Sequence, residues 1–216
     1  LGISNIEVLL LTHFDADHVG GLAGALERAQ VSQALISPFD DERPQVAVAL
    51  AQLAEADVSV STAEVGDRGT LGDATWIVAA PEPRAAGAED SNDASVILRV
   101  ETSQWLMLAF ADAGERAQMR TVRLRNSLLN RSGGKPLIVK VSHHGSADQY
   151  AELFEDLKPE VALFSAGLSN SYGHPTKRAL QIFEKAGSSI FRTDQQGSIA
   201  LTMLDGSLNV LTERER

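Results

Sequence analysis

The stretch LTHFDADHVGGL, residues 11–22, places two histidines and two aspartates within six positions, between an apolar run and a pair of glycines. In a tight loop, the spacing H-x-D-x-D-H can direct the first histidine and aspartate to one divalent ion and the second pair to its neighbour. The four residues are His13, Asp15, Asp17 and His18. Imidazole and carboxylate groups are suitable ligands for Zn²⁺ and Mn²⁺. The alternative is an ordinary helix N-cap, in which Asp17 would accept hydrogen bonds from backbone N–H groups.

Two neighbouring ions need a bridging carboxylate and further ligands from elsewhere in the chain. Asp112 follows the apolar run WLMLAF, and His143 and His144 follow LIVKV. His174 comes shortly after VALFS, so all five histidines of the chain stand in polar segments near the ends of apolar runs. Loops that a rigid sheet holds in place commonly carry functional residues. We therefore expect Asp112 and His144 to complete the metal site.

Three further segments allow more than one interpretation. The triplet GHP, residues 173–175, is either a turn in which His174 only caps the backbone or a part of the site. Asn92 and Asp93 stand at the end of the long loop 81–93, where they could form Asx-turn hydrogen bonds or contribute to the site. The adjacent histidines of SHHGS have no packing purpose after an apolar strand, which favours a functional role.

The elements that must position these residues alternate between strands and helices. Apolar and β-rich runs predict strands near 6–12, 33–37, 58–61, 75–80, 95–100, 105–110, 136–141, 161–165, 189–193, 198–204 and 207–211. Apolar residues at helical spacing predict helices near 19–30, 44–56, 114–129, 150–157 and 176–186. Because hairpins interrupt the alternation, we expect an α/β (α+β) fold with mixed sheets that helices cover, in one domain over residues 1–216.

Composition narrows the class of protein. The hydrophobic fraction of 44% and the charged fraction of 22% are ordinary for a globular domain. Cysteine is absent, which excludes thiolate ligands and thiol nucleophiles, so any metal must be bound by nitrogen and oxygen. No apolar run reaches the roughly 18 to 20 residues that a membrane-spanning helix needs. The sequence begins without methionine and enters a strand almost at once, so we expect a piece of a longer chain, which could itself be a membrane protein.

The charge is unevenly distributed. A net charge of -10 argues against a simple basic nucleic-acid-binding domain, because such domains neutralise phosphates with Lys and Arg. Positive charge is nevertheless concentrated between residues 116 and 140, a window without acidic residues. The cations of this basic window are Arg116, Arg120, Arg123, Arg125, Arg131, Lys135 and Lys140. They could form a solvated helix face or a local path for a phosphate backbone.

The opening motif resembles the H-x-H-x-D-H signature of the metallo-β-lactamase fold, with Asp15 where the second histidine usually stands. The ordered segments THFDADHVGGL, SNDASVILRV, VKVSHHGS, YGHPT and RTDQQGSIAL more narrowly resemble the C-terminal hydrolase domain of ComEC-type DNA-internalisation competence proteins. This resemblance implies a four-layer αββα sandwich with a dinuclear metal site at one edge. It also implies a polytopic membrane protein that imports single-stranded DNA, in which this domain is a nuclease for the other strand.

Carried over by position, the resemblance gives a set of metal ligands: His13, Asp15, Asp17, His18, Asp112 as the bridging residue, and His144. His143 and His174 would face the substrate. We predict two divalent ions, Mn or Zn, with Mn favoured by the carboxylate-rich ligand set. The ions would activate a water for attack on phosphorus, and the predicted catalytic residues are His143, His174 and Asp17. The predicted substrate contacts are Asn92, Asp93 and Ser146.

The chain departs from the family pattern in three ways. Ala111 replaces the glycine of the usual T-G-D motif, and no histidine lies between His18 and Asp112, where Asn92 or Asp93 could stand instead. The first strands of the family would precede residue 1, so we expect one sheet to lack them.

Two other functions remain open. A small-molecule metallo-hydrolase of lactonase or thioesterase type would use the same ions without a basic path to the site. A catalytically inactive module would bind DNA or a protein. For the nuclease, we expect the parent protein in the cell membrane and this domain on its non-cytoplasmic side.

Overall fold

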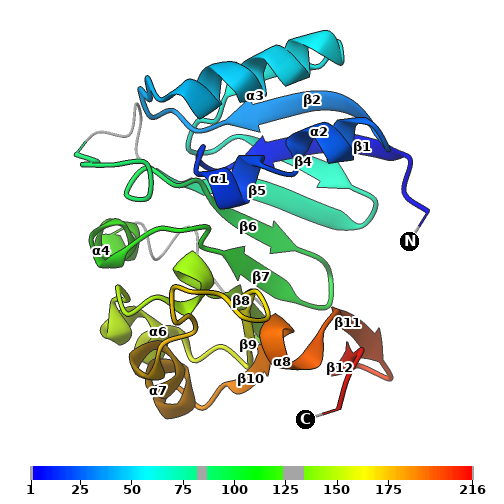
Figure 1. Cartoon of the computed structure of the whole chain (residues 1–216). Coiled ribbons are helices and arrows are strands. Elements are labelled where there is room, and N and C mark those ends of the chain that lie inside the picture. Colours follow the sequence, from blue (N-terminus) through cyan, green and yellow to red (C-terminus); the bar gives the residue numbers. More distant parts are fainter. Residues whose placement is uncertain (1, 82–86, 124–133, 216) are drawn as a thin grey trace.

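The computed structural model describes residues 2–81, 87–123 and 134–215. Two β-sheets stack on each other and helices cover their outer faces (Figure 1). The first sheet is parallel, in the order β1-β2-β3, and consists of β1 (Asn5–Leu11), β2 (Gln30–Ile36) and β3 (Ser59–Thr62). Its helices are α1 (Ala16–Val19), α2 (Leu22–Leu26) and α3 (Pro44–Glu55).

The second sheet has seven strands in the order β10-β9-β8-β7-β6-β5-β4. Its strands are β4 (Arg68–Leu71), β5 (Ala74–Ala80), β6 (Ile97–Glu101), β7 (Leu106–Ala109), β8 (Leu137–Lys140), β9 (Val161–Phe164) and β10 (Ser189–Arg192). Strands β4 to β7 pair antiparallel and β7 to β10 pair parallel, so the sheet is mixed. The hairpin β11 (Ile199–Leu204) and β12 (Ser207–Thr212) forms a separate ribbon.

Three apolar clusters define the layers. Leu22 and Leu53 of α2 and α3 pack on Leu11 and Ala34 of the first sheet. Trp76 and Val78 of the second sheet pack with Leu35 of the first, alongside Val8 and Leu10. On the far face of the second sheet lie α4 (Glu115–Arg123), α6 (Ala151–Leu157) and α7 (Lys177–Lys185). The order is therefore helix, sheet, sheet, helix, which confirms the predicted αββα arrangement. Of the two sheets, the second is mixed as predicted, whereas the first is entirely parallel.

Four buried phenylalanines fix the end of the second sheet that leads to the histidine loops. Phe154 and Phe183, on α6 and α7, have ring centroids 4.6 Å apart, and Phe110 and Phe164 pack against them at 5.4 and 5.5 Å. Each fully buried ring contributes about 1.5–3 kcal/mol of transfer free energy, and each aromatic pair adds roughly 0.5–1.5 kcal/mol. Phe110 and Phe164 directly precede site loops, so this packing holds those loops in place.

The structure corrects several predicted elements. The helix expected near 19–30 is shorter, because α1 ends at Val19, the glycine pair Gly20 and Gly21 separates it from α2, and α2 ends at Leu26 before β2 begins at Gln30. Strand β4 was not predicted, and it pairs with β5 where Gly69 lies under the Trp76 ring. The strand near 189–193 ends at Arg192, followed by α8 (Thr193–Gln196). The predicted part of the 114–129 helix beyond residue 123 lies outside the described residues.

Within the described residues, no helix combines the length and apolarity that crossing a bilayer requires.

Candidate metal centre

The ends of three strands bring the predicted ligands together. The loop after β1 continues into α1, which carries Asp17 and His18, while β7 and β8 pair in parallel and lead to Asp112 and His144. One ligand atom from each of these four residues lies within 4.8 Å of all the others. We call them the four-ligand group. Three segments that are distant in sequence thus converge on one point.

Asp112 lies at the centre of the histidines. Its Oδ2 is 3.3 Å from Nε2 of His18, 3.6 Å from that of His144, 3.7 Å from that of His143 and 3.8 Å from that of His13. The carboxylate is 3% exposed. Burial alone would raise its pKa, but the His18 hydrogen bond and the charges of His144 and His143 lower the pKa of Asp112 to about 2. The group is therefore an anion at neutral pH, placed as a bridging carboxylate would be.

His18 and His144 face each other across the group. Their Nε2 atoms are 3.3 Å apart, and Nε2 of His144 is 3.3 Å from Oδ2 of Asp17. The other ring nitrogen of His144, Nδ1, donates to the carbonyl oxygen of Ser165 at 2.7 Å, which orients the ring with Nε2 toward the group. Burial lowers the pKa of His18, but the hydrogen bond with Asp112 and the negative charges of Asp112 and Asp17 together outweigh burial and leave that pKa raised.

His13 is completely buried, and its Nε2 has no hydrogen-bond partner. Its Nδ1 lies 3.1 Å from Oγ1 of Thr12 and 3.3 Å from Oγ of Ser95. Burial, followed by repulsion from His18, lowers the pKa of His13 to about 4. A neutral buried imidazole with an unpartnered nitrogen near a carboxylate is suited to binding a cation. The buried Oδ1 of Asp112 likewise lacks a hydrogen-bond partner.

Asp15 is held by two residues that the sequence did not suggest. Its Oδ1 accepts a hydrogen bond from Oγ of Ser91 at 3.0 Å and lies 2.8 Å from Nη1 of Arg43. Arg43 is itself fixed by Asp41, with contacts of 2.9 Å from Nε to Oδ1 and 2.6 Å from Nη2 to Oδ2. Because both partners use Oδ1, Oδ2 is the Asp15 atom that can serve as a ligand. Arg43 and Ser91 then orient this carboxylate from behind.

Residues 1–166 match the family profile described as Metallo-beta-lactamase superfamily. The chain belongs to this superfamily. Membership indicates a metal-dependent hydrolase with divalent metal ions. The residues fit such ions, because the ligand atoms of the four-ligand group converge and the buried Nε2 of His13, which has no hydrogen-bond partner, lies 3.8 Å from Oδ2 of Asp112.

The chain is 29% identical over 199 residues to ComE operon protein 3 of Bacillus subtilis (strain 168). It is 28% identical over 113 residues to Competence protein ComA of Neisseria gonorrhoeae. These alignments cover 92% and 51% of this chain but 25% and 15% of the relatives, so the chain spans a quarter or less of their length. The predicted resemblance to the superfamily and to competence proteins is confirmed.

Among solved structures, the chain resembles CmlA, a diiron β-hydroxylase from Streptomyces venezuelae. The TM-score is 0.59 at 14% identity, and the match covers 88% of this chain and 44% of CmlA. This likeness shows the fold alone. Since a hydroxylase and hydrolases share the superfamily fold, the reaction must be argued from the site.

The two loops that carry Asp112 and the adjacent histidines are strained and tied together. Ala111, which replaces the family glycine, has a φ of 47°, and His143 and His144 have φ values of 46° and 53°. Each non-glycine residue in this left-handed region costs roughly 1–2 kcal/mol. The N–H of His143 donates to the carbonyl oxygen of Ala111 at 2.9 Å. The strain therefore lies at the site, as is common where backbone positions functional groups.

A buried amide network supports these loops, and the sequence analysis missed it. Gln118 and Gln149 are fully buried and joined by a 3.1 Å hydrogen bond. Gln118 donates to the carbonyl oxygen of Ala113 at 2.7 Å, and Gln149 donates to that of Ser142 at 3.1 Å. The carbonyls flank Asp112 and His143, so the network links both ligand loops to α4 and to the loop that precedes α6. No local pattern indicates it, because Gln118 lies in a helix and Gln149 in a loop 31 positions away.

His174 lies between two pockets that flank the four-ligand group. One pocket, of about 370 Å³, also includes Asp17 and His144. The other, of about 410 Å³, includes His143 and the predicted substrate contacts Asn92, Asp93 and Ser146. The ring centroids of His143 and His174 are 5.5 Å apart. The first pocket thus joins His174 to the four-ligand group, whereas the predicted substrate contacts share a pocket with His143 and His174 but not with that group. Their roles stay predictions.

The basic window contributes less free charge than its composition suggests. Arg116 forms an ion pair with Glu89, and Arg120 lies 3.3 Å from the carboxylate of Asp93. Lys135 pairs with Glu101 at 2.8 Å. Lys140 is at the end of β8, where burial lowers its pKa despite the nearby Asp112, and its Nζ donates to the carbonyl oxygen of Val141. The side chains of Arg123, Arg125 and Arg131 lie outside the described residues.

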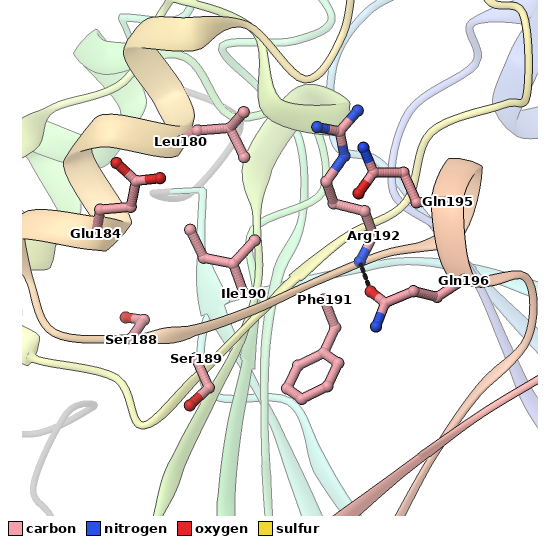
Figure 2. A pocket seen from close by; sticks show the side chains of 9 residues that line it. All are labelled: Leu180, Glu184, Ser188, Ser189, Ile190, Phe191, Arg192, Gln195 and Gln196. Atoms are coloured by element: carbon pink, nitrogen blue, oxygen red, sulfur yellow. Dashed lines mark hydrogen bonds between the residues drawn. The ribbon is translucent and has the colours of Figure 1, made fainter. Parts of the chain in front are cut away.

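A further pocket of about 700 Å³ lies beside β10, between α7 and α8 (Figure 2). Ile190 and Phe191 line it together with Leu180, and the N–H of Arg192 donates to Oε1 of Gln196 at 2.8 Å. It contains none of the predicted site residues, so we do not assign it to the reaction.

Proposed function

We propose that this chain is a metal-dependent phosphodiesterase that cleaves DNA, within a membrane protein of DNA uptake. The observation that carries the proposal is the buried Asp112 carboxylate, with Nε2 atoms of four histidines between 3.3 and 3.8 Å from its Oδ2. DNA as the substrate is supported by the segments that resemble competence hydrolases, and the competence relatives cover 92% and 51% of the chain. Placement of the domain on the non-cytoplasmic side belongs to the same proposal.

In this proposal the four-ligand group would hold one ion, and His13 and Asp15 would hold a second ion together with Asp112, whose Oδ1 lacks a hydrogen-bond partner. A pair of divalent ions supplies Lewis acidity and an activated water. Asp17, whose carboxylate is 57% exposed, lies on the open side of the group, where it can accept a proton from the attacking water. Arg43 and Ser91 keep Asp15 in one orientation.

His143 and His174 contact the phosphate or the leaving oxygen in this proposal. Burial, followed by the charges of His143 and His144, lowers the pKa of His174. A phosphate beside the ring would act in the opposite direction, because a nearby anion stabilises imidazolium. Protonation of His174 is therefore coupled to substrate binding, which suits a group that delivers a proton to the leaving oxygen.

The proposal is tested with single- and double-stranded DNA in the presence of Mn²⁺, Zn²⁺, Mg²⁺ or EDTA. We expect cleavage with Mn²⁺ or Zn²⁺, none with EDTA, and at least a hundredfold loss in Asp112→Ala. The control is Asp205→Ala, an exposed turn residue between β11 and β12, which should cleave as the original chain does. Hydrolysis of esters or lactones without cleavage of DNA would overturn the proposal.

A small-molecule metallo-hydrolase is the second candidate. It is favoured by the ion pairs of Arg116, Arg120 and Lys135, which leave little free positive charge among the described side chains of the basic window. The same assay separates the two, since this candidate predicts ester or lactone turnover that Asp112→Ala abolishes.

A further inference from the structure

Tyr172 is the most exposed large hydrophobic residue among the described residues, at 80%. It lies in the loop between β9 and α7 and precedes His174 by two positions. The Tyr172 and His174 rings are nearly parallel, with an interplanar angle of 25° and centroids 6.1 Å apart. With His174 on one side and most of the side chain in solvent, the opposite face of the phenol is open.

The loop that presents Tyr172 is firmly attached to the ligand loop. Asn170 accepts from the N–H of His174 at 3.0 Å and donates to the His174 carbonyl oxygen at 2.7 Å. The N–H of Thr176 donates to the carbonyl oxygen of Gly145 at 2.8 Å, and the ring of His144 contacts the carbonyl of Ser165. These hydrogen bonds hold the loop in one conformation, so Tyr172 is exposed on an ordered loop.

Tyr172 shares a pocket with two residues of the four-ligand group. Asp17, His144, Tyr172 and His174 line the pocket of about 370 Å³, together with the small residues Ala166 and Gly167. The volume lies within the range of about 300–1,000 Å³ that small ligands occupy. Successive contacts thus connect Asp112 to the exposed ring of Tyr172, through the rings of His143 and His174.

We propose that Tyr172, backed by His174, stacks an unpaired nucleobase next to the phosphate at the four-ligand group. This inference rests on the proposed function and adds a specificity residue to it. Stacking needs an exposed π face and no positive charge, which suits a chain whose basic window has Arg116, Arg120 and Lys135 engaged in ion pairs. Bases inside a duplex are already stacked on one another, so the site favours single strands and frayed ends.

The test compares binding of a labelled deoxyadenosine oligonucleotide to the metal-free chain and to Tyr172→Ala, Tyr172→Phe and Leu168→Ala. Leu168 is the matched control, because it is 67% exposed in the same loop but does not line the pocket. We expect Tyr172→Ala to weaken binding roughly 5- to 150-fold, and the other two variants to bind within about threefold of the original. Thermal melts should agree across all four proteins.

A second oligonucleotide with abasic sugars in place of its bases makes the test specific. We expect the original chain to bind it as weakly as Tyr172→Ala does, and Tyr172→Ala to lose nothing further. With Mn²⁺, Tyr172→Ala should raise KM for the adenine strand and leave kcat within about twofold. Equal binding of both strands by the original chain and Tyr172→Ala overturns the stacking inference, even where DNA is cleaved. Normal stacking without cleavage overturns the proposed function instead.

Discussion

Gly145 is the residue whose replacement most directly tests how the site is built. It follows His144, has a φ of 86°, and its carbonyl oxygen accepts hydrogen bonds from both the N–H and Oγ1 of Thr176. A Cβ at this position would lie 2.6 Å from Cδ1 of Phe164 and 2.6 Å from Cβ of Pro175. Neither neighbour can move easily, because Phe164 is part of the buried phenylalanine cluster and Pro175 is rigid.

Two costs add in Gly145→Ala. Alanine in the left-handed region costs roughly 1–2 kcal/mol relative to glycine. Overpacking a filled core costs about 1–3 kcal/mol more. We therefore expect the free energy of unfolding to fall by about 2–5 kcal/mol, and the affinity for Mn²⁺ or Zn²⁺ to fall with it, because the shift displaces His144.

Gly173→Ala is the matched control. Gly173 has a φ of 74°, but a Cβ added there would have no neighbouring atom within 4 Å, so only the backbone cost of roughly 1–2 kcal/mol applies. Urea unfolding with EDTA present, read as the midpoint at constant m, measures both variants. The reasoning about close packing is refuted when the two variants lose the same free energy within about 0.5 kcal/mol.

Three other substitutions address the ligands. Ala111→Gly relieves a φ of 47°, a gain of roughly 1–2 kcal/mol, but it also removes a buried methyl group, so it should stabilise the metal-free chain by about 0.5–1 kcal/mol in urea unfolding; a loss of stability would contradict this. Arg43→Gln releases Oδ1 of Asp15, so calorimetric titration should show metal affinity lower by roughly 10- to 100-fold, whereas unchanged affinity would remove Arg43 from the site. Folding lowers the pKa of His13 from 6.5 to about 4, so between these two pH values the unfolded chain binds more protons than the folded chain. The free energy of unfolding therefore falls as the pH falls. The contribution of His13 should therefore fall by about 2 kcal/mol between pH 7 and pH 5, while the raised pKa of His18 acts in the opposite direction. The measurement is the difference between the original metal-free chain and His13→Asn in the same urea series, and an equal pH dependence of the two proteins would contradict the reasoning.

The sequence predicted the site through strand ends, and that logic has a physical basis. Continuous apolar runs predict buried strands, and parallel neighbours such as β7 and β8 finish at the same edge. Residues that follow such strands therefore meet, as Asp112 and His144 do. The motifs also follow one another in the order of the superfamily pattern, and this order predicted the fold.

The partners of these residues could not be predicted in the same way. Ser91 is 76 positions from Asp15, and Arg43 comes from the loop before α3, so no local pattern connects them. The basic window shows the same limit, because the acids that pair with Arg116 and Arg120 lie in the separate loop 87–93. Strand β4 was missed for another reason. Its four residues include a glycine and an arginine and show no strand pattern of their own, and the strand forms by pairing with β5.

The backbone strain at Ala111, His143 and His144 fits the way the side chains are supported. The three residues together cost several kcal/mol, about 1–2 each, in a metal-free chain. Gln118 and Gln149 counter that cost with buried hydrogen bonds to both loops, each contributing about 0.5–1.5 kcal/mol net. Hydrogen bonds and packing within the protein therefore help to hold both ligand loops in place. The phenylalanine cluster supports the strand ends from which the loops begin, and the amide network supports the loops themselves.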